Sequence, residues 1–141
     1  MKMIHSPLFR RVMALLVLTL TGCFLPACSP EPEPVRPAEI VVGGLYASKN
    51  GDGTFSVSKV LGLDKAAVHV RIYANKFTAL PQKLDTATLT LGKLGDPGDF
   101  GVGHAPVARN GWLDSHTFLR KERVRDEELE GYALYMEEQK R

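Results

Sequence analysis

The first 22 residues restrict the fold most, because their pattern predicts that they never join the folded core. A nine-residue apolar run, Val12–Leu20, follows the basic residues Lys2, Arg10 and Arg11. Nine residues are too few to cross a bilayer, which requires about 20. A short apolar run behind a basic start is typical of a secretory signal peptide. We therefore expect residues 1–22 to be removed and the remaining 119 residues to form the mature chain.

The end of this segment carries the residues Leu20-Thr21-Gly22-Cys23. They resemble the lipobox of bacterial lipoproteins, in which small residues precede an obligatory cysteine. The resemblance implies cleavage just before Cys23, a diacylglycerol thioether on its thiol, and acylation of the new amino terminus, often by palmitate. One acyl chain binds a membrane only marginally, whereas two or three chains give a stable anchor. The resemblance therefore implies a cell-envelope protein attached to its membrane through the lipid on Cys23.

A second cysteine offers a competing lipidation site. Leu25-Pro26-Ala27-Cys28 also ends in a small residue and a cysteine. Its proline departs from the lipobox pattern, and its apolar run is already broken, so we favour Cys23. Phe24 follows that cysteine. By resemblance to the sorting rule of enteric bacteria, the absence of aspartate there favours the periplasmic face of the outer membrane over the inner membrane.

A proline-rich tether precedes the predicted fold. Four prolines occur in Ser29–Glu39, and proline disfavours helix and favours an extended path. We therefore expect three parts: the signal peptide at 1–22, the lipidated cysteine and tether at 23–39, and one small β-rich domain at 40–141. Both cysteines precede this domain, so lipidation of Cys23 leaves Cys28 without a partner for an intramolecular disulfide.

The charge of the chain gives no argument for nucleic acid as a partner. The formal charge of +2 includes three cations of the signal peptide, which leaves the mature chain near −1. A basic patch or stripe is the usual footprint of nucleic-acid binding. An apolar content of 44% is ordinary for a globular protein. We expect a folded domain that does not bind nucleic acid.

Alternating apolar residues and turn motifs predict a small antiparallel sheet. Asn50-Gly51-Asp52-Gly53 is a typical hairpin turn, because these residues tolerate positive φ. In Ala67–Ala74 the apolar and polar residues alternate most clearly. The predicted strands are Ile40–Ala47, Thr54–Leu61, Ala67–Ala74, Ala87–Leu91 and, at an edge because of its proline, Val102–Val107.

Two helices are predicted after the strands. A short one is expected at Asn110–Leu119. A longer one is expected to begin at Asp126, because aspartate is favoured at the N-cap and the acidic residues after it favour a helix amino terminus. Its predicted apolar stripe consists of Leu129, Tyr132, Ala133 and Met136, and Gly131 would permit close packing on the sheet.

These elements predict an α+β fold with four or five short strands and a C-terminal α-helix. The strands form either a small antiparallel sheet or a barrel, because the run from Gly44 to Leu91 resembles SH3-like or Tudor-like barrels.

The candidate contact residues lie on the clearest strand and after the glycine-rich loop. His69, Arg71 and Tyr73 alternate with apolar residues, which predicts an outward row suited to an interface. His104 follows the loop at 92–103 and completes the possible interaction surface. With His116 it makes three histidines that share no short ligand spacing, so we predict no metal site, no cofactor and no catalytic residue.

The function expected from these features is that of a binding or interaction module, not an enzyme. The partner would be another envelope protein or a cell-wall component. A periplasmic inhibitor or immunity-type protein is the alternative. A further alternative is a metal-dependent or hydrolytic enzyme that uses His104 and the glycine-rich loop.

Overall fold

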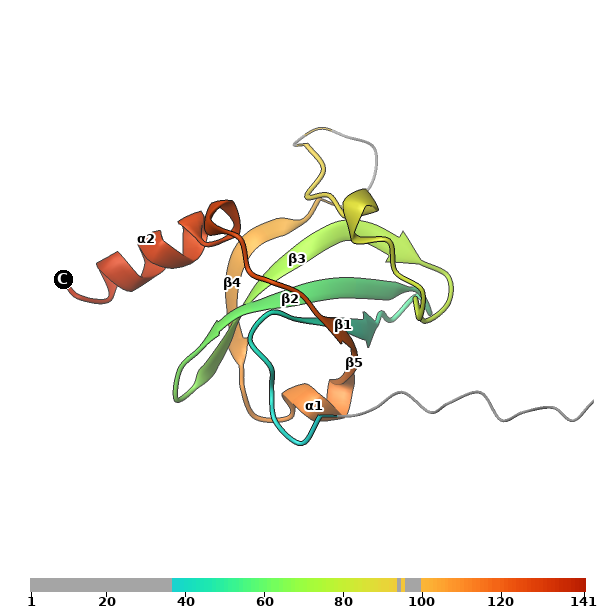
Figure 1. Ribbon diagram of the computed structural model, residues 1–141, viewed down its shortest axis with the longest axis horizontal. Helices are drawn as coiled ribbons and strands as arrows, with labels where there is room; N and C mark the ends of the chain where they lie inside the picture. Colours follow the sequence, from blue (N-terminus) through green and yellow to red (C-terminus); the bar gives the residue numbers. More distant parts are fainter. Residues whose placement is uncertain (1–36, 94, 96–99) are drawn as a thin grey trace, which may run out of the picture. The chain divides into compact units, whose positions relative to one another are not determined.

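Five antiparallel strands form one sheet in the computed structural model, which describes residues 37–93, 95 and 100–141. The strand order is β4-β3-β2-β1-β5 (Figure 1). The strands are β1 (Gly44–Lys49), β2 (Phe55–Leu63), β3 (Ala67–Phe77), β4 (Val102–Ala108) and β5 (His116–Lys121). The helices are α1 (Trp112–Ser115) and α2 (Glu130–Glu138), and the 3₁₀ turns are η2 (Thr86–Thr88) and η3 (Asp126–Glu128).

The predicted α+β class is confirmed, and of the two predicted arrangements the sheet is the open one. Strands β4 and β5 lie at the two ends of the strand order and do not close an SH3-like barrel. Pro106 lies on β4, and this edge position suits a residue without a backbone N–H donor. In the described part of the chain, no helix is long and apolar enough to cross a membrane.

Two carboxylates shape the hairpin turns. In the predicted turn between β1 and β2, Asp52 accepts hydrogen bonds from both the amide and the hydroxyl of Thr54, and Gly53 adopts a positive φ of 87°. In the turn between β2 and β3, Asp64 accepts from the backbone amides of Ala66 and Ala67 at 2.7 and 2.6 Å. The second turn therefore fixes the position of the Asp64 carboxylate at the start of β3.

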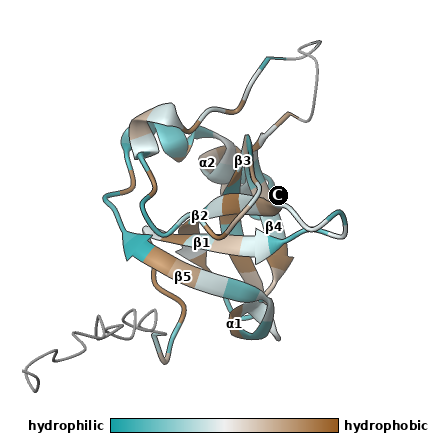
Figure 2. Ribbon diagram, turned by 90° about the vertical axis from the view of Figure 1, so that its right-hand side faces the viewer, coloured by the Kyte–Doolittle hydropathy of each residue, from teal (hydrophilic) through white to brown (hydrophobic). Residues whose placement is uncertain are grey.

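Both faces of the sheet are packed. On one face, Tyr46 packs edge-on against Trp112 and Phe118, and Val60 and Val70 join them in the larger core cluster. A second cluster, Leu45, Val57, Tyr73 and Leu84, forms on the opposite face. Figure 2 shows hydrophobic segments along the strands that supply both clusters. The second face also receives the segment after β5, which places polar groups of distant parts of the chain together.

Irregularities in the ladder decide which side chains reach the second face. The pairing of β2 with β3 shifts between Val60 and Gly62. Val60 packs in the larger cluster, whereas a Cβ atom at Gly62 would meet the ring of Tyr132 from α2. A bulge of this kind adds a residue and turns the following side chains to the other face. Gly62 therefore gives α2 room to lie against the sheet beside its register partner His69.

Two predictions of elements are wrong. The expected strand Ala87–Leu91 is instead the turn η2 followed by extended chain, because Asp85 accepts from the amide of Ala87 and starts a turn. The expected helix Asn110–Leu119 ends after Ser115 in the four-residue α1. The residues that follow pair with β1 as strand β5, and this pairing replaces the local helical hydrogen bonds.

The C-terminal helix is confirmed, but its start and its packed face differ from the prediction. The residues from Asp126 form the turn η3, and α2 begins at Glu130. Ala133 and Met136 are exposed, so the predicted stripe is wrong for them. The helix packs through Tyr132, which the predicted stripe included, and through Tyr135, which it did not; both rings contact histidines. Aromatic rings on polar neighbours thus replace the expected apolar stripe.

Candidate functional site

The predicted outward row lies on a covered face of the sheet. His69 is 0% and Tyr73 is 8% exposed, so the prediction of a solvent-facing row is wrong for these two residues. Helix α2 covers His69, and η3 approaches Tyr73. Arg71 and His104 are half-buried and stay partly accessible. We call this side of the sheet, with Lys59, His69, Arg71, Tyr73 and His104, the polar face.

The first group on the polar face is a histidine pair with an aspartate behind it. The Nδ1 atom of His69 lies 3.0 Å from Nε2 of His104, and its Nε2 atom lies 2.9 Å from Oδ2 of Asp64. The third histidine, His116, does not join them. Its ring stacks on Trp112 at a centroid distance of 3.6 Å, and it is hydrogen-bonded to the carbonyl of that residue.

Helix α2 closes over the histidine pair. The ring centroid of Tyr132 lies 4.7 Å from that of His69, and the centroid of Tyr135 lies 5.3 Å from that of His104. A Cβ atom added at Gly131 would lie 2.9 Å from Cβ of His104. The predicted role of this glycine in close packing is therefore confirmed.

Burial and charge set the protonation of this group. The amides of Ala67 and Ala66 and the ring of His69 hydrogen-bond to Asp64 and hold its pKa at about 2. Burial lowers the pKa of His104, and the charge of His69 lowers it further. At neutral pH the aspartate is therefore ionised, and His104 is held in its uncharged form.

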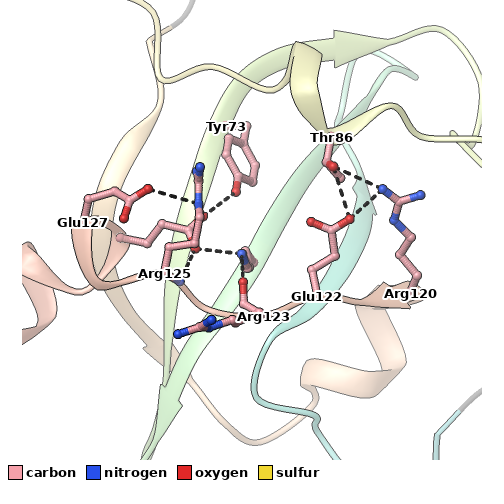
Figure 3. Close-up of polar contacts among 9 residues, drawn as sticks. Tyr73, Thr86, Arg120, Glu122, Arg123, Arg125 and Glu127 are labelled. Atoms are coloured by element: carbon pink, nitrogen blue, oxygen red, sulfur yellow. Dashed lines mark hydrogen bonds and ion pairs between the residues drawn. The ribbon is translucent and has the colours of Figure 1, made fainter.

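The second group, the lysine–glutamate cluster, consists of Lys59, Tyr73, Arg125 and Glu128. Nζ of Lys59 lies 2.7 Å from Oε2 of Glu128, and their side chains are 3% and 1% exposed. The lysine also donates to the carbonyl of Arg123 at 2.8 Å. The glutamate accepts from the backbone N–H of Arg125, and the Tyr73 hydroxyl lies 3.4 Å from it (Figure 3). The cluster ties η3 to strands β2 and β3.

The pKa shifts in this cluster follow from its contacts. Burial opposes ionisation of Glu128, but hydrogen bonds from Lys59 and Arg125, with their positive charges, outweigh it and lower the pKa of this carboxyl. Burial and the nearby Glu128 charge raise the pKa of Tyr73 to about 12, against the opposing charge of Arg71. The tyrosine is thus a hydrogen-bond donor at every physiological pH.

A small polar cavity of about 240 Å³ opens beside the lysine–glutamate cluster. Glu122 and Thr86 also line it. Arg120 donates to Glu122 at 2.6 Å, and Thr86 bonds to both of them (Figure 3). The charged groups around this cavity are therefore already paired with one another.

Arg71 is different, because none of the described residues pairs with its charge. It lies on β3 between His69 and Tyr73 and opposite Lys59 on β2. Its Nε atom is buried without a hydrogen-bond acceptor. In residues 37–93, 95 and 100–141, no hydrogen bond or ion pair reaches its guanidinium group. The polar face thus holds two groups with satisfied contacts and, between them, one cation that is free to bind an anion.

The predicted lipidation site lies outside the described residues. This applies to Cys23, to the alternative Cys28 and to the tether up to residue 36. Residues 94 and 96–99 of the glycine-rich loop also lie outside them. Within the described residues, no group of three or more histidine, cysteine, aspartate or glutamate side chains could hold a metal ion.

Several contact residues of the polar face were not predicted from the sequence. Lys59 interrupts the apolar alternation of its strand, and a lysine at an inward position is a signal for a buried partner. Glu128 stands among several acidic residues, and nothing in their order distinguishes it. Asp64 and the two tyrosines of α2 become partners of His69 only through the bulged register and the docked helix.

Comparisons with known proteins add no relative: no protein-family model, no curated protein and no solved structure matches this chain.

Proposed function

We propose that this chain is a lipid-anchored cell-envelope protein whose folded domain binds a negatively charged group of another envelope protein or of a cell-wall component. The lipobox-like residues ending at Cys23 support the anchor, and Phe24 after this cysteine supports the periplasmic face of the outer membrane. The observation that carries the binding role is the unpaired, half-buried guanidinium of Arg71.

The chemistry of arginine favours a carboxylate or phosphate as the bound group. A buried charge normally has a counter-charge, because removing it from water without one is costly. A guanidinium presents its N–H donors in a planar fork that matches two oxygens of an anion. The packed neighbours of Arg71 on β3, His69 and Tyr73, hold the strand in place and would keep this fork preoriented.

The test is crosslinking and affinity capture of the lipidated protein from intact envelopes, with mass spectrometry of the captured material. We expect one stoichiometric partner, lost with Arg71→Gln and partly retained with Arg71→Lys. Arg141→Gln is the matched control, because the guanidinium of this exposed arginine pairs with the exposed Glu137 of α2. Cys23→Ala should mislocalise the protein and lose the partner. Equal capture by the Arg71→Gln and wild-type proteins would refute binding through Arg71.

A hydrolytic enzyme is the second candidate, and the Asp64–His69–His104 chain is the observation that favours it. An aspartate that orients a histidine occurs in acid–base catalysis. Here the histidine contacts a second histidine, and no hydroxyl or thiol of the described residues forms a hydrogen bond with His104. If His104→Ala abolished turnover of a cell-wall substrate while capture was unchanged, the enzyme hypothesis would replace the binding hypothesis.

A further inference from the structure

The hydrogen bonds of the histidine pair define where its protons lie. Ionised Asp64 accepts the hydrogen on Nε2 of His69, so Nδ1 of this ring is the nitrogen that can accept a hydrogen bond from His104. The neighbouring Nε2 of His104 must then donate its hydrogen to that nitrogen. We assign these tautomers from the hydrogen-bond chain. A single hydrogen between the two rings therefore completes the hydrogen-bond chain of Asp64, His69 and His104.

The two rings meet head-on. Their planes differ by 12°, their centroids are 5.3 Å apart, and the facing nitrogens are 3.0 Å apart. This combination requires the two nitrogens to lie near the line joining the ring centres. One hydrogen fits between them, but two hydrogens would collide. A shared hydrogen also fits better than a shared metal ion, because tetrahedral zinc needs lone pairs that converge at an angle.

Helix α2 contacts this pair through its aromatic side chains. Its described ring contacts are those of Tyr132 and Tyr135 with the two histidines. The opposite side of the helix is open, since Leu134 is 61% exposed. Figure 1 shows the helix leaving the sheet beside β4 and extending away from it. A change in the relative position of the two rings would therefore disrupt the ring contacts that hold the helix against the sheet.

We propose that the histidine pair is a proton-operated latch: when both imidazoles are protonated, each facing nitrogen carries a hydrogen, and these two hydrogens drive the rings apart and release α2 from the sheet. This inference is independent of the proposed function, because it concerns the helix and not the ligand of Arg71. It predicts that mild acid exposes the floor beneath α2, which includes Gly62 and His69.

Charged and titratable groups from several elements surround the histidine pair. Asp64 faces His69, and Arg109 donates to the backbone carbonyl of Asp64. Arg71 lies within the shift of the β3–β4 register between Val70 and Ile72, and the two tyrosines belong to α2. The register partners of His69, Gly62 and Pro106, do not titrate.

A pair with one added proton still keeps a single hydrogen between the facing nitrogens, so the second proton opens the latch. The sign of the pH response follows from the lowered pKa of His104 in the docked state. When the helix is released, this ring regains an ordinary pKa of about 6.5. The released state therefore binds more protons below that pH. The docked state has its full stability relative to the released state above about pH 6.5. This stability decreases as the pH falls toward the lower pKa of the docked ring.

The test uses the full chain in detergent, with ¹⁵N-labelled imidazoles followed by NMR and amide hydrogen exchange followed in α2 and β3. Between about pH 7 and about pH 5.5 we expect the protection factors of α2 to fall about tenfold relative to β3, because each pH unit between the two pKa values changes the ratio of states up to tenfold. In His104→Gln, an amide nitrogen replaces Nε2 and keeps the donor without the titration. This variant should hold its helix throughout.

His116→Asn is the matched control. Burial lowers the pKa of His116 too, but its ring contacts Trp112 and not the latch. This variant should release α2 as the wild type does. The latch is overturned if His104→Gln releases its helix with the wild-type pH dependence, or if the wild-type helix stays protected after both imidazoles are protonated. If His104→Gln is already undocked at neutral pH, the wild type decides: coincident midpoints of imidazole titration and helix release support the latch, and separate midpoints overturn it.

Discussion

Removal of the Glu128 carboxylate should destabilise the domain strongly. In Glu128→Ala, the ammonium group of Lys59 stays buried at 3% exposure and loses its counter-charge. Breaking one side of a buried ion pair costs about 3–5 kcal/mol. The carbonyl of Arg123 still accepts one hydrogen bond from the lysine, so we expect a loss near the lower limit, about 3 kcal/mol. The free energy of unfolding of small domains is about 5–15 kcal/mol, so the variant should still fold and its stability should be measurable.

A double variant separates the free-energy cost of an unpaired Lys59 charge from the net contribution of the ion pair to stability. Lys59→Met with Glu128→Leu removes both charges and keeps similar volumes, and such replacements are often neutral or stabilising. Here the N–H of Arg125 and the hydroxyl of Tyr73 lose their acceptor, which costs about 1–3 kcal/mol when such donors stay buried. The double variant should therefore lose no more than Glu128→Ala alone.

Urea unfolding followed by tryptophan fluorescence measures these changes, because the single tryptophan, Trp112, is buried at 3% exposure. Glu137→Ala is the control, since its pair with Arg141 is exposed and such pairs contribute about 0–1 kcal/mol. The reasoning would be refuted if Glu128→Ala cost as little as Glu137→Ala. It would also be refuted if the double variant lost clearly more stability than Glu128→Ala alone.

Three further outcomes are expected. Gly131→Ala improves helix propensity by up to about 1 kcal/mol, yet its methyl group meets Cβ of His104 at 2.9 Å, so amide exchange in α2 should become faster. The pKa of Asp64 is about 2 in the fold and about 3.9 in the unfolded chain, so its contribution to stability is complete above about pH 4 and is lost as the pH falls toward 2. The urea midpoints of Asp64→Asn should therefore vary less with pH over this range than those of the wild type. Membrane fractionation and mass spectrometry should show that Cys23→Ala loses the lipid while Cys28→Ala keeps it.

The sequence predicted the elements whose signals are local. The turn at Asn50–Gly53 and the alternation in β3 depend on neighbouring residues, and both are present in the structure. The edge position of β4 followed from one proline. The segment at 87–91 was mispredicted because alternation alone does not reveal that Asp85 starts a turn. Strand β5 was mispredicted because its pairing with the distant β1 outweighs a weak local helix pattern.

The candidate site was predicted only in part for the same reason. Alternation placed His69, Arg71 and Tyr73 on one face, but it carried no information on what covers that face. The cover comes from the last 20 residues, whose attachment depends on contacts 55 to 69 residues apart in sequence, such as those of Glu128 with Tyr73 and Lys59. Contacts at such separation leave no periodic signal.

The two polar groups attach the C-terminal segment with different sensitivity to acid. Glu128 has a lowered pKa, so its contribution is lost only below the ordinary glutamate pKa of about 4.3. The histidine latch begins to open below about 6.5. Because η3 and α2 are adjacent in sequence but held by different groups, mild acid should release the helix while the lysine–glutamate cluster still fixes η3 to the sheet. Release of both at one pH would mean that η3 and α2 unfold as a single cooperative unit, and the two attachments would then not act separately.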